Sequence, residues 1–195
     1  MVSMSTGLPG LAIAGDGGGP GAAQLQVQER AGQRLEWAIR QRLLHDIARD
    51  HLSLGRVHLG LALTAPGRAA PGEEAEADFA QAAEHLDRAV EGLRQAAQEL
   101  YIPRGLLARA TFHRLRENRA GAAADLTEAL EIAERGPMRL YECDAHLEWA
   151  RLCRDQGDLA AARRHIARAR ELVNETGYGR REREVRWLEE TVGKG

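Results

Sequence analysis

A triplet of small, large and small residues recurs along this chain and restricts what the chain can fold into. Three copies follow one another at a constant interval of 40 positions, at Ala82-x3-Leu86-x2-Ala89, Ala122-x3-Leu126-x2-Ala129 and Ala162-x3-Ile166-x2-Ala169. On a helix with 3.6 residues per turn, spacings of four and three place each triplet on one face. A helix cannot bury such a face alone, so the repeat predicts stacked pairs of helices.

The segments before the triplets repeat at the same interval and complete the hairpins. Leu107, Ala110, His113 and Arg114 precede Leu147, Ala150, Cys153 and Arg154 by 40 positions. In the last hairpin we expect one apolar stripe on each helix, divided by a turn at 155–158: Leu140, Cys143, Leu147 and Ala150 on the first helix, and Leu159, Ala162, Ile166, Ala169 and Leu172 on the second. The sequence therefore predicts an all-α solenoid of antiparallel helix hairpins.

These motifs resemble the tetratricopeptide repeat (TPR). The small-large-small second helix matches the three triplets, Leu54-Gly55 matches the family's Leu-Gly pair, and Gly157-Asp158-Leu159 matches its turn. The resemblance covers residues 31–174. The chain departs from the family where the early Trp is replaced by His51, Leu106 and His146, and where the Tyr is replaced by His58, His113 and Cys153. The longer period implies helices extended by a turn or more.

The chain divides into a leader and one repeat domain. Gly, Ser, Ala and Pro dominate residues 1–22, which we expect to be flexible, and residues 23–195 form the TPR-like domain. This domain holds about three repeats, an N-terminal half-repeat built on Ala31-x3-Leu35-x2-Ala38, a loop insertion at 64–77 and a cap helix at 180–191. We expect the other helices at 24–41, 43–63, 78–100, 104–117, 121–135, 138–154 and 159–173, with an interruption near 40–42. A half-repeat predicts the C-terminal end of a longer array.

Charge and apolar content exclude several classes of function. The formal net charge is −2 and the pI about 6.4, so nothing drives binding to nucleic acid or to an anionic membrane. No apolar run reaches the ~18 residues of a membrane span. Cys143 and Cys153 lie ten residues apart on one expected helix, too far for a disulfide, which indicates a cytoplasmic protein. Lys194 is the only lysine among 27 basic residues, which indicates a GC-rich bacterial gene.

Candidate catalytic and metal-binding residues are few. The sequence has no nucleophile elbow, Walker loop or metal-binding His and Cys motif of defined spacing, so we expect neither an enzyme nor a cofactor. His51 and His58 lie two helical turns apart, and Cys143 and His146 are three residues apart, so each pair could share a metal. Packing between helices explains these side chains better than metal binding does. A small metal protein built on His51, His58 and His113 is the least favoured alternative.

The resemblance implies a binding surface, because the first helices of tetratricopeptide arrays line a concave groove. The matching positions alternate arginine and leucine: Arg49, Leu52, Arg56 and Leu59, then Arg104, Leu107, Thr111 and Arg114, then Asp144, Leu147, Arg151 and Arg154. Such a surface suits a peptide with apolar side chains and carboxylates. The alternative is that these arginines pair with Glu84, Glu148 or Asp155. On the first interpretation, Arg114→Ala leaves stability nearly intact and weakens binding.

The sequence therefore predicts a non-enzymatic module that binds a protein or an acidic peptide. It looks like the C-terminal sensor arrays of bacterial STAND-type NTPases and related regulators, although the Lys/Asn carboxylate clamp of chaperone-binding members is not reproduced. A second hypothesis is self-association through the open N-terminal edge, where Leu35 and Trp37 would pair with their own copy.

Overall fold

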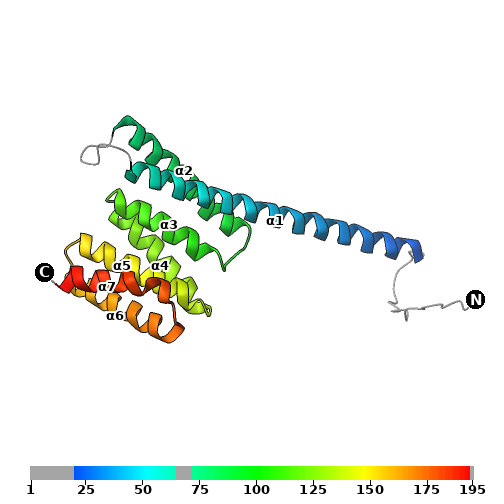
Figure 1. The fold of residues 1–195 in the computed structure, drawn as a ribbon. Helices are drawn as coiled ribbons and strands as arrows, with labels where there is room; N and C mark the ends of the chain where they lie inside the picture. The colour runs from blue at the N-terminus through cyan, green and yellow to red at the C-terminus, as the bar shows by residue number, and fades with distance from the viewer. Residues whose placement is uncertain (1–19, 65–71, 194–195) are drawn as a thin grey trace, which may run out of the picture. The chain divides into compact units, whose positions relative to one another are not determined.

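The computed structural model describes residues 20–64 and 72–193, with side chains at 40, 43–64 and 72–193 (Figure 1). Within these ranges all regular structure is helical, which confirms the all-α prediction. The α-helices are α1 (Pro20–Thr64), α2 (Glu73–Gln95), α3 (Ile102–Leu115), α4 (Arg119–Arg135), α5 (Arg139–Asp155), α6 (Leu159–Thr176) and α7 (Glu182–Gly193), and a 3-10 turn, η1 (Gly179–Arg181), precedes α7. None of the described helices is both long enough and apolar enough to cross a lipid bilayer.

The chain forms two units, residues 1–39 and 40–195. In the first unit the described backbone, residues 20–39, is the N-terminal part of α1. The predicted leader therefore lies outside the described residues up to residue 19, and the side chains of the half-repeat, including Leu35 and Trp37, lie outside them too. The second unit holds the predicted repeats.

In this second unit the helices pack pairwise in chain order, as a helical solenoid requires. Contacts run from α2 to α3, from α3 to α4, and onward to α7, while α3 also contacts α5 across the array (Figure 1). The part of α1 that begins at Arg40 packs on α2, where Gly55 leaves room for the Leu86 side chain and Gly92 leaves room for Ala48. A methyl group at either glycine would lie within 3.0 Å of these neighbours.

The small-large-small triplets form the interior of each hairpin, as the sequence predicted. Leu86 and Leu126 are fully buried, Ile166 is 4% exposed, and the alanines that flank them are at most 1% exposed. Alanine at these positions allows the backbones to approach, and the large residue fills the space between helices. We call this repeated interior the seam.

Two hairpin turns, at matching positions of successive repeats, have the same conformation with different residues. Asn118 accepts a hydrogen bond from the backbone N–H of Gly121 at 3.0 Å, and Asp158 accepts one from Ala161 at 2.8 Å. Both residues are helix N-caps, which satisfy N–H groups that have no partner inside the helix. The preceding residue has positive φ in both turns, 58° at Glu117 and 81° at Gly157.

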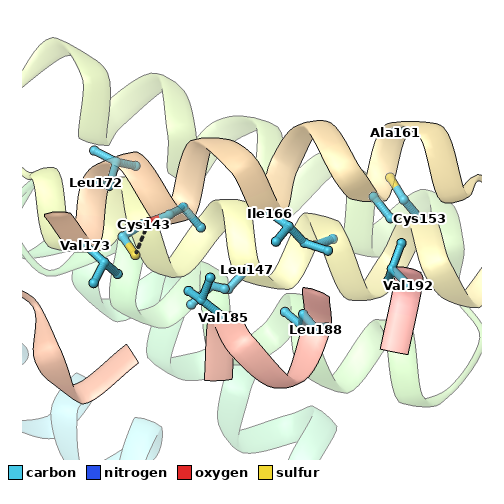
Figure 2. Packing of buried hydrophobic residues seen from close by; sticks show 13 residues of the cluster. Cys143, Leu147, Cys153, Ala161, Ile166, Leu172, Val173, Val185, Leu188 and Val192 are labelled. Atoms are coloured by element: carbon cyan, nitrogen blue, oxygen red, sulfur yellow. Dashed lines mark hydrogen bonds between the residues drawn. The ribbon is translucent and has the colours of Figure 1, made fainter. Parts of the chain in front are cut away.

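Helix α7 closes the C-terminal end of the array, as predicted for a cap helix. Val185, Leu188 and Val192 are at most 1% exposed and pack with Leu147 and Ile166 of the last hairpin (Figure 2). Gly177 is the C-cap of α6 and adopts the left-handed conformation, with φ 68°, which glycine favours.

Several predicted boundaries were wrong. The interruption near 40–42 does not occur, because Arg and Gln are good helix formers and α1 runs through them. Helix α2 begins at Glu73 instead of residue 78, so residues 73–77 of the predicted loop are helical, and residues 65–71 lie outside the described residues. Glu73, Glu74 and Glu76 favour this earlier start, because carboxylates stabilise the positive end of a helix dipole.

A candidate binding groove

A groove of about 1010 Å³ runs across the first helices of the hairpins. Helices α1, α3 and α5 contribute most of its lining, and the segment from the end of α6 into α7 forms one side. The lining contains seven arginines and three carboxylates: Arg56, Arg104, Arg114, Arg139, Arg151, Arg180 and Arg181 with Asp144, Glu148 and Glu184. The groove is therefore cationic on a chain whose net charge is −2.

The structure brings together most of the residues predicted for the inner face. Those that line the groove are Arg56, Leu59, Arg104, Leu107, Thr111, Arg114, Asp144 and Arg151. They come from three helices that lie far apart in the sequence, and the resemblance to tetratricopeptide arrays, applied through the repeat register, predicted them on one surface. Leu59 contributes little apolar surface because it is 8% exposed.

Four other predicted residues lie elsewhere. Leu147 is 1% exposed and packs in the core with α6 and α7, so it offers no surface to a partner. Arg49 and Leu52 line a smaller hollow of about 230 Å³, which shares Arg56 and Arg104 with the groove. The Arg154 guanidinium lies 5.4 Å from the centre of the Trp187 ring and pairs with Asp155.

Many groove arginines pair with carboxylates of the same chain. Arg114 donates to Glu148 at 2.7 Å and to Asp155 at 2.8 Å, and Arg151 donates to the other oxygen of Glu148 and to Glu184. Arg181 bridges Asp144 and Glu184 in the same way. The alternative that arginines pair with Glu148 and Asp155 is thus confirmed for Arg114. We expected Arg114→Ala to leave stability nearly intact, and this expectation assumed that the Arg114 side chain has no partner within the chain.

Three groove arginines have no ion-pair partner among the described side chains: Arg56, Arg104 and Arg180. Arg56 lies at the surface, but the groove walls crowd its guanidinium, and this partial burial lowers the pKa of Arg56. The positive charge of Arg104 lowers that pKa further. Asp144, which pairs with Arg181, raises the pKa of Arg56 by a smaller amount. Arg56 and Arg104 therefore still repel each other, and a further carboxylate beside them would relieve this repulsion.

Sequence reasoning missed the apolar part of the groove. Leu100 and Leu140 line it and are 54% and 46% exposed, and Tyr141 lies beside Leu140. We predicted Leu140 in the apolar stripe of its helix, but it lies in the first turn of α5 and faces the groove. The sequence does contain a signal for this apolar surface, because the pairs Leu100-Tyr101 and Leu140-Tyr141 occupy equivalent positions of successive repeats.

The histidines of the least favoured metal-binding alternative contact other side chains. The Nδ1 atoms of His51 and His85 lie 2.8 Å apart, and those of His146 and His165 lie 2.9 Å apart. His58 pairs with Asp78 at 2.8 Å. Burial raises the pKa of the Cys143 thiol to about 11, so this cysteine is a poor metal ligand.

One group of described side chains lies close enough to reach a single metal ion: Glu134, Glu142 and His146. Both carboxylate oxygens of Glu142 already accept hydrogen bonds, from Arg139 and from Arg168, each at 2.8 Å. A divalent cation would therefore have to displace two guanidinium groups.

Comparisons with protein-family models, with curated proteins and with solved structures gave no match.

Proposed function

We propose that this chain is a non-enzymatic interaction module whose groove binds an acidic segment of a protein partner. The observation that carries the proposal is the combination of unpaired arginines and exposed leucines in one groove. Arg56 and Arg104 carry positive charges that form no ion pair among the described side chains, and Leu100 and Leu140 provide apolar surface in the same groove. A segment that places carboxylates next to apolar side chains matches both features.

The groove holds two kinds of arginine, and this division supports the proposal. The paired arginines, such as Arg114 and Arg151, hold the groove wall through Glu148, whereas Arg56, Arg104 and Arg180 keep their guanidinium donors for a ligand. A carboxylate can accept two parallel N–H bonds from one guanidinium, which fixes its orientation. We infer that the unpaired arginines orient the partner and that leucine burial supplies much of the affinity.

The resemblance to tetratricopeptide arrays supports a scaffold or sensor role in a bacterial cytoplasmic regulator. Two further observations agree with this proposal. Both cysteines are free and buried, as suits a reducing compartment, and arginine strongly outnumbers lysine. Any catalytic step of such a regulator would belong to another domain or protein.

Fluorescence anisotropy tests the proposal with labelled peptides that combine leucines with glutamates. The matched control peptides carry glutamine in place of each glutamate. We expect saturable binding of the acidic series, weakened at least tenfold by Arg56→Ala/Arg104→Ala and reduced by added salt. Arg88→Ala is the matched protein control, because Arg88 pairs with Glu84 along α2 and does not line the groove. Equal binding of acidic and neutral peptides would contradict the proposal.

A further inference from the structure

One face of α1 carries a row of large apolar side chains that lie open to solvent. Leu43, Ile47, Leu54, Val57 and Leu61 are 44% to 59% exposed. Spacings of three, four and seven residues place them within one narrow strip of the helix surface, and Asp50 occupies the same strip. We call this strip the α1 stripe. It holds five of the eight exposed large apolar residues in the described part of the chain.

The following first helices bury the corresponding face on another helix. In the repeat register Ile47 corresponds to Ile102 of α3, and Val57 corresponds to Leu152 of α5. Ile102 is 8% exposed and packs with Val90 and Leu93 of α2, whereas Leu152 is 1% exposed and packs with Leu126 of α4. The fold therefore shows which kind of element covers this face, namely an apolar helix.

The α1 stripe is complementary to itself when two copies run antiparallel. With the two-fold axis near residue 52, Leu43 lies opposite Leu61 of the other copy, and Ile47 lies opposite Val57. Asp50 then lies opposite Leu54.

A parallel pair would instead place the two Asp50 carboxylates directly opposite each other, where like charges repel. Ser53 and Gly60 flank the stripe, and a methyl group at Gly60 would meet nothing within 4 Å, so a second backbone can approach closely.

We propose that the α1 stripe is a dimerisation surface, occupied by the α1 stripe of a second copy in antiparallel orientation. This surface differs from the groove, and the inference stands independently of the proposed function. The stripe extends ~27 Å along the helix at 1.5 Å per residue, and one helix is ~10 Å across. Such a pair buries a few hundred Å² per copy, less than the ~800 Å² typical of stable complexes, so the dimer depends on concentration.

Sedimentation velocity of the full chain from about 1 to 500 µM measures this equilibrium. We expect the average mass to rise toward twice that of one chain. Leu54→Glu/Val57→Glu should abolish this rise and leave the melting temperature within about 2 °C, because both side chains are already exposed. Leu140→Glu is the matched control, since Leu140 is similarly exposed but lies in the groove, and it should leave the rise intact.

Engineered cysteines test the orientation. In the antiparallel pair Ile47→Cys/Val57→Cys brings residue 47 of each copy against residue 57 of the other, and glutathione redox buffer should give a disulfide-linked dimer. Neither single variant should crosslink, because residues 47 and 57 lie ~15 Å apart along α1. The native Cys143 and Cys153 are buried and do not interfere.

Three results would overturn the proposal. Crosslinking of the single variant Ile47→Cys would show a parallel pair. A mass that stays at one chain over the whole concentration series would show that another protein, or another segment of the same chain, covers the stripe. A dimer that Leu54→Glu/Val57→Glu does not weaken would show that copies associate through a different surface.

Discussion

The seam triplets lie on the second helices of the hairpins and the groove wall lies mainly on the first helices, and the two regions differ in how closely the repeats match. In the seam, each repeat places residues of the same size at the same position, as the buried Leu86, Leu126 and Ile166 show. On the groove side the register position that holds Leu59 in α1 holds Arg114 in α3 and Arg154 in α5. These three side chains are buried, ion-paired, and stacked on Trp187, respectively.

This difference has a physical cause. The distance between packed helices is fixed by the side chains between them, so repeats that stack at a regular spacing need the same volumes in every seam. A groove position contacts solvent on one side and can change in size and charge without moving a backbone. The repeats therefore share their packing and differ in their surface chemistry, so the surface can change while the fold is kept.

The largest effect should follow a cavity in the seam. Leu126→Ala removes a side chain with no exposed surface that packs between Ala110, Ala122 and Leu152. We expect the free energy of unfolding to fall by about 2–5 kcal/mol, because surrounding helices cannot close the space completely. Urea denaturation followed by circular dichroism measures this loss.

Leu140→Ala is the control for the same chemical change on the groove side. Leu140 is 46% exposed, so we expect a loss within about 0.5 kcal/mol. Similar losses for Leu126→Ala and Leu140→Ala would contradict the distinction between seam and groove.

The sequence predicted the seam well because its information is periodic and local. The constant interval between repeats and the spacings of three and four within them identify the buried face of each second helix without knowledge of its neighbours. The hairpin turn at Gly157 was predicted equally well, because it depends on a few adjacent residues.

The sequence predicted the groove less well because its chemistry depends on which side chains meet across helices. Arg114 finds Glu148 and Asp155 at separations of 34 and 41 residues, and spacing does not indicate whether the side chains reach one another. Leu140 was assigned to a core stripe because periodicity identifies a face but not which of its positions a neighbouring helix covers. The run of α1 through 40–42 was missed because the apolar pattern changes there while the backbone continues.

An acid-dependent loss of stability should distinguish the outer hairpins from the middle one. His146 packs against His165, and burial together with the neighbouring imidazole lowers the pKa of His146 to about 4. Glu142 raises this pKa and Arg168 lowers it, both by smaller amounts than burial does. The folded state therefore prefers neutral His146, whereas the unfolded chain takes up the proton near pH 6.5.

Stability should accordingly be constant above about pH 6.5 and fall as the pH decreases toward 4, by about 1–3 kcal/mol for this group. The middle hairpin carries Leu106, which is fully buried, where α5 carries His146. His146→Leu copies that residue into the last hairpin and should flatten the pH dependence measured by urea denaturation between pH 7 and pH 4.5. An unchanged slope in His146→Leu would show that other groups cause the acid sensitivity.

The smallest effects should separate the two kinds of groove arginine. Arg114→Ala removes hydrogen bonds to Glu148, a buried carboxylate that keeps only Arg151 as its partner, so we expect a loss of about 1–2 kcal/mol. Arg104→Ala breaks no ion pair among the described residues and removes a positive charge beside Arg56, so stability should stay within about 0.5 kcal/mol.

Thermal melting and peptide anisotropy on the same two variants complete this test, because each substitution should change the result of only one of the two measurements. We expect Arg114→Ala to lower the melting temperature by several degrees, and Arg104→Ala to weaken binding of an acidic peptide without changing the melting temperature. If Arg104→Ala lowers the melting temperature as much as Arg114→Ala does, Arg104 supports the fold. The groove would then have one fewer cation for a ligand, and the proposed division between arginines that support the fold and arginines that bind a ligand would not hold in the first turn of α3.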